Sequence, residues 1–221
     1  MTNVKFKIFL LGVFVFILFV LFSYLVHKDL FSALDFDTTV RIQDHLSRRF
    51  DTPFSLFSLF GSVEIVSILL LVLIAFTRKL KSILILFFYA GFHFIELFGK
   101  VFVTHPGPPY LFFRYDIAFE FPSSYVQPGS SYPSGHSART AFISALLLVM
   151  VLSSNKLSNV SKLIIFLFVF LFDVTMFVSR IYLGEHWLSD VVGGAMLGIS
   201  AGLISSLLLS FSALKIKKAS K

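Results

Sequence analysis

Two short segments of this chain carry residues whose types and spacing suit phosphate chemistry. In one of them, His186 and Asp190 lie four positions apart, so on a helix that begins near His186 they share a face and the carboxylate can orient the imidazole. Arg180 closes the preceding apolar run, and its planar, permanently charged guanidinium matches phosphate oxygens. This set predicts a bound phosphate beside an imidazole that acts as a nucleophile or a base.

The other segment supplies a second histidine. Ser134, Gly135 and His136 precede the apolar run from Ala141 to Leu152, so backbone N–H groups at the start of a helix can face an anion there. Phosphoryl transfer needs one group to attack and another to protonate the departing oxygen, and His136 with His186 meets that need. Three further histidines are interpreted as capping or packing residues: His27, His45 and His105.

Both segments lie at the ends of predicted membrane spans. Of the 221 residues, 57% are hydrophobic and 30 are Phe, and the mean hydropathy is +0.88, which excludes an ordinary soluble domain. Runs of about 20 apolar residues can cross a bilayer. We therefore predict an all-α polytopic membrane protein, a single domain over residues 1–221 with six transmembrane helices. The helices are expected near residues 7–26, 53–76, 82–103, 136–152, 163–179 and 188–211.

The first apolar run is expected to stay in the protein as a membrane anchor, because it is longer than a signal peptide core and has no small-residue cleavage site. Residues 27–52 are expected to form a short interfacial helix, with Asp37 as its N-cap, that roofs the site. Residues 105–135 are rich in proline and aromatic side chains. This composition favours anchoring at headgroup depth, and a lipid-entry gate is the alternative.

The distribution of basic residues predicts the orientation of the spans. Lysine and arginine concentrate in residues 5–7, 78–81, 156–162 and 215–221, so this side and both termini are expected in the cytoplasm and the two phosphate-binding segments outside. The net charge of +7 is explained by this topology signal and by anionic headgroups, so no nucleic-acid partner is expected. There is no cysteine, which excludes a thiol nucleophile, a disulfide and a cysteine metal site.

Polar and small residues also occur inside the spans. His93, Glu96 and Lys100 share a helix face. Lys100 is expected to contact phosphate, with an ion pair to Glu96 as the alternative, and His93 and Glu96 are interpreted as structural. Asp173 lies seven residues before Arg180 and is a candidate counter-ion for that guanidinium. One small-residue stripe suits close helix packing within the monomer or, alternatively, a dimer interface, which leaves the oligomeric state open. It consists of Gly194, Gly198 and Gly202.

The two segments resemble signature motifs of the type 2 phosphatidic acid phosphatase superfamily. Pro133-Ser134-Gly135-His136 matches its second motif, and Ser179-Arg180, five residues, His186, three residues, Asp190 matches its third. The first motif, Lys, six residues, Arg-Pro, is only partly present: Lys100 and Pro108 have the right spacing, but Gly107 stands where the family has arginine. The resemblance covers about half of the chain, from the third predicted span onward.

The resemblance implies a mechanism. His186, oriented by Asp190, would attack phosphorus and form a phosphohistidine, while His136 would protonate the leaving oxygen and later activate water. Phosphate would be held by four matched residues: Lys100, Ser134, Gly135 and Arg180. Arg139, one helical turn after His136, is expected to replace the arginine absent at Gly107, and Arg114 is a second candidate. No carboxylate cluster suits a divalent ion, so we expect metal-independent catalysis without a cofactor.

The function predicted from these residues is an integral membrane enzyme that hydrolyses a lipid phosphate or diphosphate at the outer face. Candidate substrates implied by the resemblance are undecaprenyl diphosphate, phosphatidylglycerol phosphate and phosphatidic acid. The isoprenoid diphosphate is preferred because the site faces outward, where that carrier is recycled. The alternatives are a lipid phosphotransferase and a catalytically silent lipid-phosphate binding or transport protein. Vanadium haloperoxidases share the motifs, but they are soluble proteins.

Overall fold

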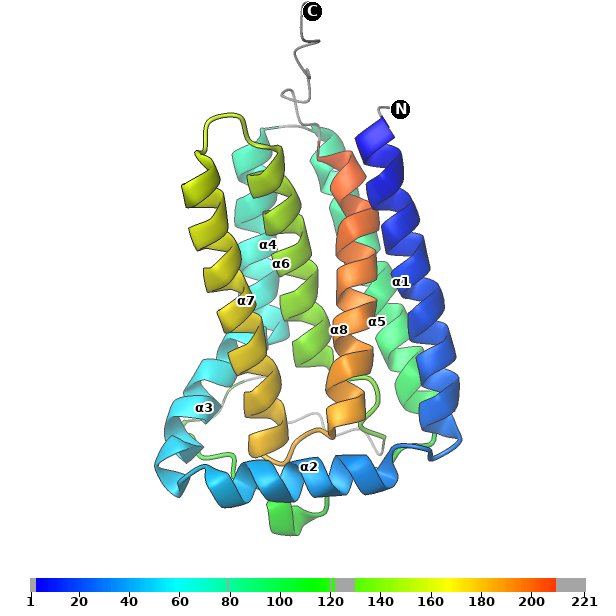
Figure 1. Ribbon diagram of the computed structural model, residues 1–221, viewed down its shortest axis with the longest axis vertical. Coiled ribbons are helices and arrows are strands. Elements are labelled where there is room, and N and C mark those ends of the chain that lie inside the picture. Colours follow the sequence, from blue (N-terminus) through cyan, green and yellow to red (C-terminus); the bar gives the residue numbers. More distant parts are fainter. Residues whose placement is uncertain (1–2, 79, 120, 122–129, 210–221) are drawn as a thin grey trace, which may run out of the picture.

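The protein is a bundle of long helices crossed at one end by a shorter helix (Figure 1). The computed structural model describes residues 3–78, 80–119, 121 and 130–209, and within these ranges it contains helices and turns but no strand. The α-helices are α1 (Asn3–His27), α2 (Ser32–His45), α3 (Asp51–Ser58), α4 (Val63–Thr77), α5 (Ile85–Phe102), α6 (Gly135–Ser153), α7 (Asn159–Tyr182) and α8 (Leu188–Ser205). The short 3₁₀ helices are η1 (Arg48–Phe50), η2 (Leu59–Gly61), η3 (Leu80–Leu84), η4 (Tyr110–Phe112) and η6 (Ser206–Leu208).

Five helical segments are long and apolar enough to cross a membrane, and a bent pair forms a sixth candidate span. The all-helical membrane fold predicted from hydropathy is thus confirmed. The second span differs from the predicted continuous helix, since Arg48–Gly61 and Val63–Thr77 meet at an angle of 46°. Ser62 causes the break: its backbone is extended, and its hydroxyl caps α4 by accepting the Ile65 N–H at 3.3 Å.

Helix α2 is the predicted interfacial helix, and it lies across the end of the bundle formed by the start of α8 and the end of α7 (Figure 1). It begins at Ser32, so the prediction that Asp37 caps it was wrong. Asp37 instead pairs with Arg41 one turn later, at 2.7 Å. The buried face of α2 is polar, and Gln43 donates to the carbonyls of Phe112 and Tyr182 at 2.7 and 2.8 Å. Hydrogen bonds therefore hold α2 against the end of α7 and the loop that contains Phe112.

The glycine stripe of α8 lies on α6 of the same chain, as the monomer interpretation predicted. A Cβ at Gly194 would meet the Ser134 carbonyl, one at Gly198 would overlap the Ala138 carbonyl, and one at Gly202 would lie 2.7 Å from Ala145 Cβ. The two backbones therefore approach closely along their length. This contact brings the start of α6 and the start of α8, which carry the two motifs, to the same end of the bundle (Figure 1).

Substitution of Gly198 tests this packing. Gly198→Ala is expected to lower the free energy of unfolding by about 1–3 kcal/mol, because the added methyl group has no room against α6. Gly91→Ala on α5 is the matched control, since a Cβ there meets no atom within 4 Å. Thermal unfolding in detergent should show a lower Tm for Gly198→Ala and no loss for Gly91→Ala. Equal Tm values would contradict the close approach.

Candidate active site

His186 and Asp190 meet at the start of α8, as their spacing predicted. His186 Nδ1 lies 3.5 Å from Asp190 Oδ2, and the same oxygen accepts the Trp187 N–H at 2.9 Å. The carboxylate is fully buried and thus held in place by the first turn of the helix it belongs to. With Nδ1 facing the carboxylate, Nε2 is the ring nitrogen left for attack.

The surroundings of His186 keep its imidazole neutral. Burial lowers its pKa to about 4, and the charges of Lys100 and Arg180 act in the same direction, whereas Asp190 opposes the shift. Near neutral pH the ring therefore carries a free lone pair, which is the form that can attack phosphorus.

The start of α6 is built as the sequence predicted. Ser134 is the N-cap, and its hydroxyl accepts from the Ser137 N–H at 3.4 Å and from the Ser137 hydroxyl at 3.1 Å. The Ser134 N–H donates to the Asp190 carbonyl at 2.9 Å, which ties the two motifs together. Gly135 has no room for a side chain, because a Cβ would overlap the Glu96 carboxylate. His136 follows in the first turn and packs on Gly61.

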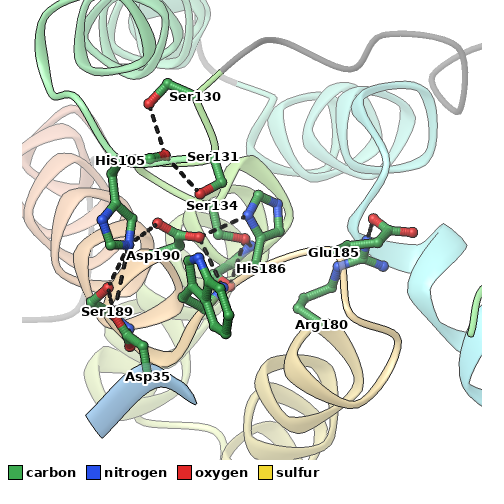
Figure 2. A network of polar contacts seen from close by, with 12 residues as sticks. Asp35, His105, Ser130, Ser131, Ser134, Arg180, Glu185, His186, Ser189 and Asp190 are labelled. Atoms are coloured by element: carbon green, nitrogen blue, oxygen red, sulfur yellow. Dashed lines mark hydrogen bonds and ion pairs between the residues drawn. The ribbon is translucent and has the colours of Figure 1, made fainter. Parts of the chain in front are cut away.

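Arg180 is a buried cation with unused donors. Its guanidinium is fully buried at the end of α7, and its Nε and Nη1 have no hydrogen-bond partner among the described residues. Its ion pair is with Glu185, which directly precedes His186 (Figure 2). Asp173 accepts a hydrogen bond from Ser144 at 2.8 Å instead, so the prediction that it would be the counter-ion of Arg180 was wrong. Buried N–H groups without an acceptor fit an anion such as phosphate.

Lys100 projects from α5 toward the segment that precedes α6. Its Nζ lies 3.5 Å from the Ser131 carbonyl. Gly107, the position where the family has arginine, is next to the same residue: a Cβ there would lie 3.5 Å from Ser131 Cβ, an ordinary contact. The incomplete first motif therefore still reaches the site through Lys100, and position 107 has room for a side chain.

Arg139 lies on α6, one helical turn after His136. Its Nε donates to the Gly61 carbonyl at 2.8 Å, its Nη1 lies 3.5 Å from Glu96 Oε2, and its Nη2 lies 3.5 Å from His136 Nδ1. Glu96 also pairs with His93 at 3.0 Å, in keeping with a structural role for both side chains. The guanidinium is thus close to the second histidine, and contact with phosphate stays a prediction.

Arg139→Ala, alone and combined with Gly107→Arg, tests that prediction. We expect the single variant to lose about 10²-fold in kcat/KM, as is typical when one donor to the transition-state charge is removed, and the second substitution to recover part of the loss by supplying the family's arginine. Phosphate release by folded, monodisperse protein is the measurement. If the double variant recovers nothing, Arg139 acts through His136 and not on phosphate.

The described residues contain no group of three or more His, Asp or Glu side chains arranged to hold a metal ion. Metal-independent catalysis stays a prediction. Sequence reasoning missed the carboxylate on Arg180, Glu185, although its place between two motif residues was a usable signal. It also assigned His105 to packing, whereas the structure places its ring against Asp190 (Figure 2).

This helical bundle, with two histidines and two cations collected at one end, has the site of a membrane phosphatase family. Residues 80–212 match the family model of the PAP2 superfamily, and the chain belongs to this family. The resemblance inferred from the motifs is thereby confirmed.

Individual relatives agree with this assignment. Phosphatidylglycerophosphatase B of Bacillus subtilis (strain 168) is 30% identical over 69 residues, which are 31% of this chain and 34% of that protein, so the match spans about a third of the relative's length. The crystal structure of a transmembrane PAP2-type phosphatidylglycerolphosphate phosphatase from Bacillus subtilis superimposes with a TM-score of 0.71 at 17% identity, over 88% of this chain and 93% of that one. Aquifex aeolicus LpxE gives a TM-score of 0.55 at 28% identity, over 78% and 94%.

Proposed function

We propose that this protein is a metal-independent lipid phosphatase that works through a phosphohistidine at the outer membrane face. The observation that carries the proposal is a buried imidazole, His186, that faces the Asp190 carboxylate and has its pKa lowered, near a buried guanidinium, Arg180, whose Nε and Nη1 have no hydrogen-bond partner among the described residues. A protein that only binds phosphate needs the cation but not an oriented nucleophile. Residues 1–221 would act as one phosphatase domain, since the site is assembled from α5, α6, α7 and α8.

In the first step, the lone pair on His186 Nε2 attacks phosphorus in line with the ester oxygen. The N–P bond forms as the P–O bond breaks, and the leaving oxygen takes a proton from His136. In the second step, water gives a proton to His136 and attacks the phosphohistidine, which releases inorganic phosphate and restores both rings. Asp190 stabilises the positive charge that develops on His186.

The phosphoryl oxygens would be held by cations and by the start of α6. Lys100 and Arg180 supply positive charge, and the Ser134 hydroxyl and the Gly135 N–H supply donors at a helix N-terminus. Phosphate oxygens would take the place of the Glu185 carboxylate on Arg180. Phosphoryl transfer needs charge stabilisation and positioning above all, and these groups provide both.

The membrane orientation follows from the positions of the basic residues. The site lies at the end of the bundle opposite the start of α1 (Figure 1). Lys5, Lys7, Lys81, Lys156 and Lys162 belong to the other end, at the start of α1, in η3 and around the connection from α6 to α7. By the positive-inside rule that end is cytoplasmic. Lys79 and the lysines beyond residue 209, which entered the same prediction, lie outside the described residues.

The substrate would be a lipid phosphate or diphosphate that reaches the site from the outer leaflet. Phosphatidylglycerol phosphate is included because relatives of this chain are named for it, and undecaprenyl diphosphate and phosphatidic acid carry the same reacting group. The site described here recognises phosphate, and the lipid part would be selected by the surrounding helices and loops.

Phosphate release by purified protein in detergent tests the proposal. The three lipids are offered separately, with and without EDTA, and His186→Ala protein is the blank. We expect release by the wild type that EDTA does not reduce. Release that EDTA abolishes would overturn the metal-independent mechanism, and labelled phosphate that moves from lipid to an added alcohol without release would identify a phosphotransferase. Lipid binding without either reaction would identify a silent binding protein.

A further inference from the structure

The ring of His105 is buried between two carboxylates that come from different helices. Its Nε2 lies 3.5 Å from Asp190 Oδ1 and 3.6 Å from Asp35 Oδ2, and its side chain is 6% exposed. Asp190 therefore has an imidazole on each of its oxygens: His105 at Oδ1, and His186 at Oδ2. Figure 2 shows the two rings on opposite sides of this carboxylate.

Asp35 connects this cluster to α2. One of its oxygens accepts the Ser189 N–H at 2.8 Å, and the other accepts the Ser189 hydroxyl at 2.6 Å. That hydroxyl also lies 3.1 Å from His105 Nε2. Asp35 thus serves as a second cap for the start of α8, one residue before Asp190, and shares the His105 ring with it.

The backbone of His105 is fixed independently of its ring. Its carbonyl accepts the Ser131 N–H at 3.0 Å and the hydroxyls of Ser130 and Ser131 at 3.2 Å. The edge of the ring faces Tyr132, with centroids 6.4 Å apart and planes at 90°. The ring is thus carried by a segment whose backbone is tied to residues just before α6, which keeps the ring close to the two carboxylates.

Two buried carboxylates around one ring nitrogen require positive charge. Burial raises the pKa of Asp35, and the charge on Asp190 adds to this effect, while the hydrogen bonds from Ser189 and the charge on His105 oppose it. The His105 ring gives both carboxylates one shared partner, whereas removal of the ring leaves the two acidic groups together in a buried site.

We propose that His105 and Asp35 are positioning residues for the nucleophile, forming a buried relay in which Asp35 holds His105, His105 holds and neutralises Asp190, and Asp190 orients His186. The inference rests on the proposed function of His186. It means that the catalytic carboxylate is oriented from both sides, and that α2 contributes to catalysis without contacting the substrate. The relay also determines how strongly the Asp190 carboxylate raises the pKa of His186.

The relay predicts the direction of a pH effect. Charged and titratable groups around His105 are Asp35 from α2, Asp190 from α8 and Tyr132 from the loop. Around His186 they are Asp190, Lys100 from α5, Arg180 from α7 and His136 from α6. Without His105, the full charge of Asp190 acts on His186, so the imidazole becomes protonated at higher pH. The acidic limb of kcat/KM is therefore expected to move upward.

Kinetics of His105→Leu, Asp35→Asn and the double variant test the relay. The control is His45→Leu, an exposed histidine on α2. We expect kcat of His105→Leu to fall about 10- to 100-fold, the range known for partners that orient a reacting group from outside, with KM unchanged and the acidic limb raised. Asp35→Asn in the His105→Leu protein removes one of the two unpaired carboxylates, so the double variant should regain thermal stability but not kcat.

Each outcome has a distinct meaning. If the wild type releases no phosphate, the proposed function fails before the relay is tested on it. If the wild type is active and His105→Leu keeps kcat and its acidic limb, the relay is refuted. If His105→Leu lowers only Tm and the amount of folded protein, while the folded fraction or the double variant has wild-type kcat, His105 is structural and the inference is wrong. His105→Gln, which keeps one donor, should recover part of kcat if the relay is correct.

Discussion

His186→Ala is expected to reduce phosphate release from every substrate by about 10⁴-fold or more, the scale seen when the nucleophile of a hydrolase is removed. The reason is chemical: the Nδ1 of His186 faces the buried Asp190 carboxylate at 3.5 Å, which leaves Nε2 for attack on phosphorus. The loss should not depend on the leaving group, because the nucleophile is needed whichever oxygen departs. His45→Ala is the matched control, since this exposed histidine lies on α2 at the same end of the bundle and its Nδ1 lies 2.8 Å from the Arg41 carbonyl of its own helix.

The same residue fixes the expected pH profile. His186 attacks only when neutral, and its pKa is about 4 in the folded protein. Its reactive form is therefore present above that pH and is lost as the pH falls through it, so kcat/KM should decline with an apparent pKa near 4 rather than near the ordinary value for histidine, about 6.5. An acidic limb at the ordinary value would contradict the buried, neutral imidazole.

A trapping experiment separates loss of the nucleophile from loss of binding. With a ³²P-labelled substrate and rapid acid-free quenching, the wild type should carry label that is stable to alkali and labile to acid, as expected for an N–P bond. His186→Ala should carry none. A variant that loses the label but keeps turnover would show direct attack by water, and a variant that keeps the label would move the nucleophile to another residue.

Much of this architecture can be predicted because membrane constraints act on local sequence. Spans follow from apolar length, and the pairing of His186 with Asp190 follows from helical periodicity once α8 begins near His186. Ser134 as the cap of α6 is also a local property. These features depend on residues within one or two turns of each other, which is the range over which a single sequence carries geometric information.

Contacts between distant segments were not predictable in this way. Asp35 and Ser189 are 154 positions apart, and no periodicity relates an interfacial helix to the start of the last span. The expectation that Asp37 caps α2 also failed: its position resembled an N-cap locally, but the helix begins at Ser32, so that Asp35 lies in its first turn and its side chain reaches Ser189 at the start of α8. Glu96 lies on α5, and packing against α6 places its Oε2 3.5 Å from Arg139 Nη1, a partner that no local pattern indicated. Tertiary neighbours decide where buried charges pair.

His136→Gln is expected to lower kcat on a lipid phosphate by about 10²–10⁴-fold, the usual contribution of a general acid. A lipid alcohol is a poor leaving group, so its oxygen needs a proton as the P–O bond breaks. A substrate whose leaving group is already stable as an anion, such as p-nitrophenyl phosphate, does not need that proton in the first step. We therefore expect His136→Gln to lose much less phosphoenzyme formation with p-nitrophenyl phosphate than with lipid, while His186→Ala loses both equally.

This contrast tests the division of roles between the two rings. Glutamine retains a side-chain amide near the Arg139 guanidinium, which lies 3.5 Å from Nδ1 of the native ring, so the packing against Gly61 is disturbed little. The measurement is the burst of p-nitrophenol followed by the steady state. His136→Gln should keep the burst and slow the later turnover, because water must still be activated to release the phosphohistidine. Equal losses on both substrates would show that His136 binds or positions phosphate instead of protonating the leaving oxygen.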